Sequence, residues 1–196
     1  AIDTLKKQGV ELIVTVDCGI TANHEAALCR ELGIDLVITD HHECKSELPQ
    51  AIALVDPHRK DQPQPVTEMA GVGVAFKLAA AIEGEQETLL DQYCDFLCLG
   101  TVADVMPLTG ENRTMVARGL KALENPRRVG IAALMAECSV QKGPVTAGTI
   151  GYTLAPRINA AGRMGEVGIA TELFLTHDAG RAVELAGALC RLNRRR

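Results

Sequence analysis

The chain has 196 residues, 47% of them hydrophobic and 3% aromatic, with a formal net charge of −5. This length and apolar content suffice for a substantial core, and without Trp that core is built from Ala, Leu, Val and Ile, as in α/β sheets. The net charge does not by itself indicate a protein that binds nucleic acid, although local basic clefts can lie on acidic proteins. Without a long apolar run or a signal peptide we expect no membrane partner.

The first third of the chain alternates strands and helices. Apolar runs predict buried strands, whereas polar–apolar periodicity ended by glycine predicts helices, the second of them capped by Asn23. The strands are expected at residues 10–17, 34–39 and 51–55, and the helices at residues 1–8 and 23–32. Because the connections are short, we expect an α/β fold: a parallel sheet with flanking helices on both faces.

The rest of the chain is predicted to be mainly helical. A loop with Pro63 and Pro65 covers residues 60–66, residues 100–108 are irregular, and a helix opening at residues 144–152 precedes a loop at residues 155–165. Helices are expected at residues 68–82, 87–99, 112–123, 130–137, 169–175 and 179–196, the last capped by Asp178. We therefore divide the chain into an α/β part (1–66), a helical part (67–177) and the start of a long connecting helix (178–196).

Seven cysteines are scattered along the chain, an odd number without any CxxC pair. This usage predicts reduced thiols in a cytoplasmic protein. Cys94 and Cys98 share one helix face and are expected in the core.

Ligand-type side chains follow two successive strands. Residues 12–19 (LIVTVDCG) end in Asp17, and residues 36–43 (LVITDHHE) end in Asp40, His41 and His42. Because the carboxyl ends of parallel strands meet at one sheet edge, these side chains are expected to form one site.

Carboxylate and imidazole ligands together suit Mn²⁺, Mg²⁺, Fe²⁺ or Zn²⁺, and a bridging carboxylate can hold two such ions for phosphate-ester hydrolysis. The alternatives are structural. Asp17 is also a candidate turn cap, and Asp40 a turn residue or an acceptor that fixes one imidazole. Asp104 stands in an apolar stretch where a carboxylate needs compensation, which favours a ligand role.

Residues 156–164 (PRINAAGRM) are interpreted as a loop in which Arg157 and Arg163 flank small side chains and bind phosphate; the alternative is a solvated loop with structural arginines. Residues 56–59 (DPHR) suit a turn or a site equally. The lone Gly-x-Gly at residues 71–73 favours helix packing over phosphate binding.

Together these stretches resemble the motifs of the DHH phosphoesterase superfamily, and within it the RecJ type of single-strand-specific 5′-to-3′ exonucleases. The matching segments are residues 16–20 (VDCGI), 40–43 (DHHE), 70–76 (AGVGVAF), 100–108 (GTVADVMPL) and 156–163 (PRINAAGR).

The resemblance implies a two-metal site for Mn²⁺ or Mg²⁺ that cleaves single-stranded DNA in repair and recombination. It implies metal ligation by Asp17, His41 and Asp104, catalytic roles for His42 and Asp40, and phosphate binding by Arg163, Arg157 and Asn159. It also implies a single-strand-binding protein or a helicase as partners.

Two family features are missing from these residues: an Asp-x-Asp motif before Asp17, where Asp3 stands alone, and a downstream substrate-binding domain. We therefore expect an incomplete DHH domain that binds metal weakly and is nearly inactive by itself. Two other hypotheses stay open: a DHH phosphodiesterase for short oligonucleotides or cyclic dinucleotides, and a non-catalytic DHH-like scaffold for DNA or replication proteins.

Overall fold

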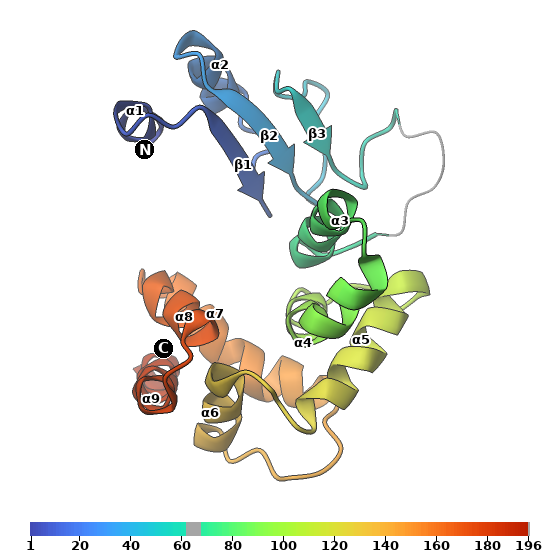
Figure 1. Ribbon diagram of the computed structural model, residues 1–196, viewed down its shortest axis with the longest axis vertical. Helices are drawn as coiled ribbons and strands as arrows, with labels where there is room; N and C mark the ends of the chain where they lie inside the picture. Colours follow the sequence, from blue (N-terminus) through green and yellow to red (C-terminus); the bar gives the residue numbers. More distant parts are fainter. Residues whose placement is uncertain (62–67, 196) are drawn as a thin grey trace. The chain divides into compact units, whose positions relative to one another are not determined.

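The computed structural model of the chain describes residues 1–61 and 68–195, which form two compact units (Figure 1). The first unit contains Ala1–Asp91 and Met106–Arg113, and the second contains Gln92–Val105 and Thr114–Arg196. Pro63, Pro65 and the boundary predicted after residue 66 lie outside the described residues. Each unit is described by itself below.

The first unit is built on a parallel three-stranded sheet in the order β1-β2-β3. The strands are β1 (Leu12–Val16), β2 (Asp35–Thr39) and β3 (Ala53–Val55). Val14 pairs with Val37, which in turn pairs with Ala53, so the three strands end at one edge. The α/β fold with a parallel sheet is confirmed.

Helices α1 (Ile2–Lys7) and α2 (Asn23–Glu31) pack on one face of this sheet. Ala26 and Cys29 of α2 are buried against Leu36 and Ile38, and Ile2 packs on the same cluster. The residues that alternate with these point to the other face, where Leu12, Val14 and Val16 are 43–54% exposed. Among the described residues, α1 and α2 cover one face of the sheet, so the prediction of helices on both faces is confirmed for that face only.

Helix α3 (Gly71–Glu83) follows β3 and contacts β1 and β2, and Figure 1 shows it beyond the carboxyl ends of the strands. Helix α4 (Gln86–Ala103) then leads from the first unit into the second. It continues four residues beyond the predicted end at residue 99, and Thr101 in this extension is buried, as Leu97 and Cys98 are before it.

The second unit is helical. After α4 it comprises most of α5 (Gly110–Leu123), then α6 (Val129–Glu137), the π-helix η1 (Thr149–Leu154), α7 (Ala155–Arg163), α8 (Val167–Leu175) and α9 (Ala179–Arg195). Helix α9 packs against α6, α7 and α8 through an apolar face that includes Leu185 and Leu189. Among the described residues, no helix combines the length and the apolar character needed to cross a membrane.

Local details test the predicted caps and cysteines. The backbone N–H of Arg181 donates to Asp178 Oδ1 at 2.9 Å, so the predicted cap of α9 is confirmed. The cap by Asn23 is wrong: Ala22 precedes α2, and the Asn23 amide instead donates to the Glu47 carbonyl. Cys94 and Cys98 are buried as predicted, and none of the seven cysteines, all of them described, forms a disulfide bond.

Candidate metal centre

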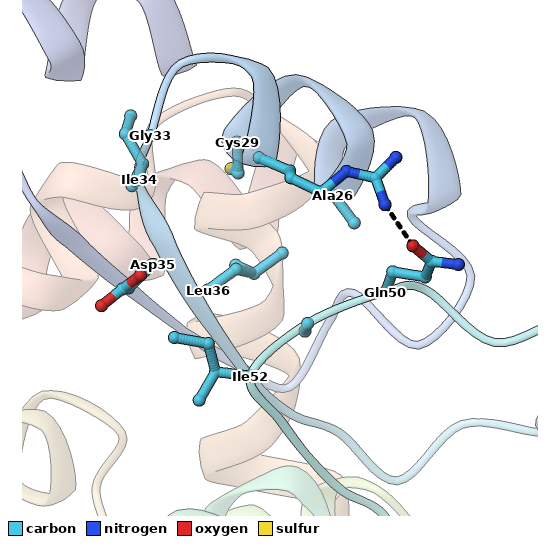
Figure 2. A pocket seen from close by; sticks show the side chains of 10 residues that line it. Ala26, Cys29, Gly33, Ile34, Asp35, Leu36, Gln50 and Ile52 are labelled. Atoms are coloured by element: carbon cyan, nitrogen blue, oxygen red, sulfur yellow. Dashed lines mark hydrogen bonds between the residues drawn. The ribbon is translucent and has the colours of Figure 1, made fainter.

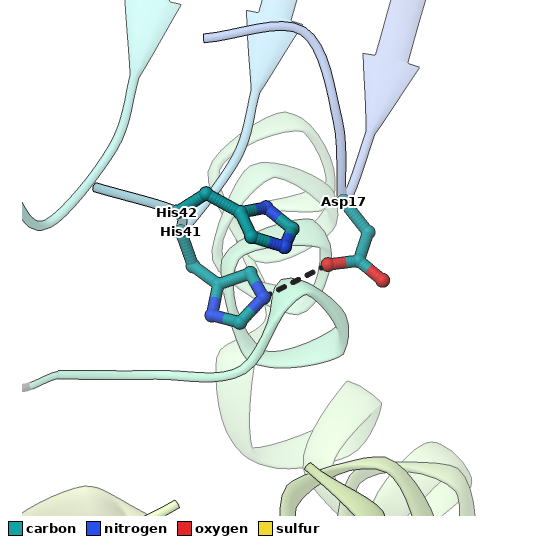
Figure 3. A group of neighbouring side chains, drawn as sticks. All are labelled: Asp17, His41 and His42. Carbon is teal, nitrogen blue, oxygen red and sulfur yellow. Dashed lines mark ion pairs between the residues drawn. The ribbon is translucent and has the colours of Figure 1, made fainter. Parts of the chain in front are cut away.

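Three ligand-type side chains meet where β1 and β2 end (Figure 3). Asp17 follows β1, and His41 and His42 follow β2; one ligand atom from each lies within 4.8 Å of the others. His41 Nε2 is 3.0 Å from Asp17 Oδ1, and the two imidazole centroids are 4.6 Å apart. The predicted convergence of these three residues is present in the structure.

Asp17 has a left-handed backbone conformation, with φ of 62°. This region is uncommon outside glycine, and Asp is among the residues that tolerate it best. Three bonds hold the turn: Asp17 N–H to the Thr39 carbonyl at 3.0 Å, the Thr15 hydroxyl to the Cys18 carbonyl at 2.7 Å, and Ile20 N–H to Asp40 Oδ2 at 2.9 Å. The turn is thus tied to the end of β2, which aims the Asp17 carboxylate toward His41.

Gly71, the first residue of α3, leaves the space that Asp17 occupies. A Cβ atom placed on Gly71 would lie 2.2 Å from Asp17 Oδ1 and 2.5 Å from Asp17 Cβ. The prediction of a packing role for this glycine is therefore correct, but its neighbour is a candidate ligand rather than another helix. Nothing in the sequence links these positions, which lie 54 residues apart along the chain.

Asp40 is buried, and its carboxylate accepts several hydrogen bonds. Oδ2 accepts from Ile20 N–H, while Oδ1 accepts from His41 N–H at 2.8 Å and lies 2.7 Å from His42 Nδ1. Burial is the largest influence and opposes ionisation, but these hydrogen bonds together lower the pKa of Asp40. Asp40 therefore orients His42, and Nε2 is the His42 nitrogen that can meet an ion or a phosphate.

Exposure separates the three ligand-type groups. The His41 side chain is 10% exposed, whereas those of Asp17 and His42 are 59% and 60% exposed. An ion held by Asp17 and His41 is thus reachable from solvent, and His42 lies where a substrate would approach.

The end of β3 adds a third set of polar groups. Asp56 is 1% exposed and accepts a hydrogen bond from His58 N–H at 2.8 Å, which closes the predicted turn. Burial raises the pKa of Asp56, because it outweighs that hydrogen bond and the attraction of the nearby His58 and His41.

Asp104 stands just after α4, in the second unit. Its backbone N–H donates to the Gly100 carbonyl at 3.0 Å, and its side chain is exposed. The apolar setting inferred from the sequence is therefore wrong, because Val105 next to it is 86% exposed with a φ of 57°. The ligand role of Asp104 stays a prediction.

The basic segment at residues 155–165 is mainly helical, so its prediction as a loop is wrong. Pro156 fits the first turn of α7, and the small side chains of Ala160 and Ala161 are buried in the core of the second unit. One Arg157 nitrogen donates to the Thr153 carbonyl at 2.6 Å. Asn159 and Arg163 are exposed, so they are the better placed of the predicted phosphate contacts.

A cavity of about 330 Å³ lies at the other end of β2, near Gly33 and Asp35 (Figure 2). Ala26 and Leu36 line its apolar wall, and a hydrogen bond between Arg30 and Gln50 crosses its rim. It contains none of the candidate ligands, so it is separate from the centre at the carboxyl edge.

Comparison with known proteins places this arrangement in a family. The family described as DHH family, N-terminal domain, matches residues 2–101. This chain belongs to the DHH family. The match contains Asp17, Asp40, His41 and His42, so the residues that meet at the sheet edge lie inside the DHH domain.

Curated relatives of this DHH chain are single-stranded-DNA-specific exonucleases named RecJ. The Bacillus subtilis protein is 43% identical over 196 residues, and the Escherichia coli protein is 35% identical over 208 residues. Each match covers the whole chain but only 25% and 36% of these relatives, so the chain spans about a quarter to a third of their length.

Solved structures of RecJ proteins have a fold similar to that of this chain. RecJ from Thermus thermophilus in complex with Mn²⁺ superposes with a TM-score of 0.86 and 36% identity, over 100% of this chain and 30% of that one. A manganese-bound exonuclease RecJ gives a TM-score of 0.83 and 36% identity, over 98% of this chain and 49% of that one.

Proposed function

We propose that residues 1–196 form most of the DHH domain of a RecJ-type exonuclease, which as a whole protein hydrolyses phosphodiester bonds of single-stranded DNA from the 5′ end. The observation that carries this proposal is the meeting of Asp17, His41 and His42 at one sheet edge. Relatives that match the whole chain are named single-stranded-DNA-specific exonucleases, which supports the substrate and the reaction, whereas the 5′ polarity is proposed from the family resemblance alone.

The geometry of the centre fits a divalent cation. Adjacent ligands of an octahedral ion at about 2.1 Å lie about 3.0 Å apart. His41 Nε2 and Asp17 Oδ1, which contact each other as an ion pair in this structure, have this separation. Imidazole nitrogen suits Mn²⁺ better than Mg²⁺, which prefers oxygen, so we favour Mn²⁺ with Mg²⁺ as the alternative. From the family resemblance alone, Asp104 is proposed as a further metal ligand and a second ion is proposed to bind.

When bound, such ions supply an activated water and stabilise the charge that develops on the phosphate. The chain's own residues prepare the centre for this chemistry. His41 and Asp17 hold ligand atoms toward each other, and Asp40 fixes the His42 ring through Nδ1. His42 Nε2 is then positioned for the scissile phosphate or its water, while Asp40, being buried, acts through His42.

Phosphate groups of the DNA are assigned to α7. Arg163 is exposed in its last turn, and Asn159 lies one turn earlier on the same face. Arg157 is half-buried and uses one nitrogen within the helix, which leaves the remaining donors of its guanidinium for phosphate. We rank Arg163 first.

A cytoplasmic location is proposed because none of the seven cysteines forms a disulfide bond. A single-strand-binding protein or a helicase is proposed as a partner from the family resemblance alone.

The test is a nuclease assay of the full-length protein on 5′-phosphorylated single-stranded DNA with Mn²⁺. Asp17→Asn and His41→Ala should each lower the rate by at least about 100-fold, since each removes a ligand that the chemistry needs. His24→Ala is the matched control, because His24 is exposed on α2.

Activity that survives both ligand substitutions, or that is unaffected by a metal chelator, would contradict the proposal. Preferential cleavage of dinucleotides over long single strands would favour the DHH phosphodiesterase alternative.

A further inference from the structure

Tyr152 is an unusual aromatic residue in this chain. The sequence contains five Phe and Tyr residues in total. Phe76 is buried, Phe96 packs edge-on against Phe174, and the Arg128 guanidinium stacks over Tyr93 and Phe96. Tyr152 instead exposes 86% of its surface, so its ring makes little contribution to folding.

The element that carries Tyr152 is also unusual. Tyr152 lies in the π-helix η1, which continues directly into α7. π-helical turns are rare and concentrate at functional positions. Ile150 and Leu154 of η1 are buried in the core of the second unit, so the backbone that carries the exposed Tyr152 ring is held in place by packing.

Tyr152 shares an exposed face with the polar residues of α7. Asn159 and Arg163 follow it by seven and eleven residues, across the junction of η1 and α7, and both are exposed. Between them Gly162 is exposed, with no atom within 4 Å of the position that a Cβ would take. The face thus presents a ring, an amide, an open glycine and a guanidinium in line along one helical segment.

We propose that Tyr152 stacks on an unpaired base of single-stranded DNA whose backbone runs past Asn159 and Arg163. Aromatic platforms beside cationic groups are the usual means of holding single strands without sequence preference, because every base has a π face. This inference rests on the proposed function, since it assigns a binding residue to the same substrate.

The test measures binding of a fluorescent single-stranded oligonucleotide to the full-length protein in EDTA, where no hydrolysis occurs. Tyr152→Ala should weaken binding about 5- to 100-fold, whereas Tyr152→Phe, which keeps the ring, should bind as the wild type does. Thermal unfolding of both variants should match the wild type, because the side chain is exposed.

Abasic oligonucleotides separate stacking from a general surface effect. A strand without bases should bind the wild type more weakly, and Tyr152→Ala should lose less affinity for this strand than for the strand with bases. Equal binding by Tyr152→Ala and wild type, or additive losses from the substitution and from base removal, would overturn the stacking role while leaving the exonuclease assignment intact. Failure of the wild type to bind single-stranded DNA at all would overturn both.

Discussion

Replacing Gly71 with alanine should disturb the metal centre without removing any candidate ligand. The added Cβ would lie 2.2 Å from Asp17 Oδ1, 2.4 Å from its Cγ and 2.5 Å from its Cβ. Real Cβ atoms essentially never approach another atom closer than 3.0 Å, so these contacts must open by about 1 Å. Rotation of the Asp17 side chain cannot relieve the overlap, because its own Cβ takes part in it.

The displacement must therefore move the Asp17 backbone or the start of α3. A shift of Asp17 would strain its N–H bond to the Thr39 carbonyl and displace its carboxylate, so the 3.0 Å spacing between this carboxylate and His41 is expected to be lost. Overpacking costs about 1–3 kcal/mol, from which the better helix propensity of alanine subtracts up to about 1 kcal/mol. We expect a net destabilisation of about 1–2 kcal/mol, and a loss of Mn²⁺ affinity of about 10- to 100-fold, as for other changes that misorient a ligand.

Calorimetric titration of the full-length protein with Mn²⁺, together with denaturant unfolding, measures both effects. Gly168→Ala is the matched control, because Gly168 also lies in the first turn of a helix but has no atom within 4 Å of its Cβ position. Wild-type Mn²⁺ affinity in Gly71→Ala would refute the inferred role of this glycine.

Three further predictions follow from single residues. Asp40→Asn should destabilise the protein by about 2–4 kcal/mol in denaturant unfolding and should slow DNA cleavage. The reason is that the amide would place N–H groups against the backbone N–H groups whose hydrogen bonds the carboxylate now accepts. A stable, fully active variant would contradict this prediction. Arg163→Ala should weaken binding to all single-stranded sequences, measured as a titration at several salt concentrations. The slope of log K against log salt concentration should become less steep by about 0.7, the effect of one phosphate contact, whereas Lys121→Ala should change neither the affinity nor the slope. Burial raises the pKa of Cys98 to about 12, so at about pH 8 its neutral thiol should resist alkylation until the protein unfolds, while exposed Cys18 is modified first in peptide mass spectrometry.

The fold of the first unit was predictable because apolar strands ending in ligand-type residues are a local pattern. The strands at residues 12–16 and 35–39 were found within a few residues of their ends, and parallel pairing then brought Asp17 and His41 to one edge. The contact of Gly71 with Asp17 depends on where α3 lies in space, which no local pattern specifies.

The helical second unit was harder to predict where small residues are ambiguous. Residues 155–163 contain proline, glycine and alanines, a composition that suits a loop near phosphate. Tertiary packing decides otherwise, because Ala160 and Ala161 fit the close approach of α7 to the core. The exposure of Asp104 could not be inferred either, since its apolar neighbour Val105 points to solvent.

The most direct test of the centre is pulsed electron paramagnetic resonance of Mn²⁺ bound to the full-length protein. If His41 ligates the ion through the arrangement seen here, the wild type shows coupling to an imidazole nitrogen, and His41→Ala loses it with a weaker affinity, while His24→Ala retains both. A wild-type spectrum without nitrogen coupling, or an identical spectrum and affinity in His41→Ala, would contradict the account.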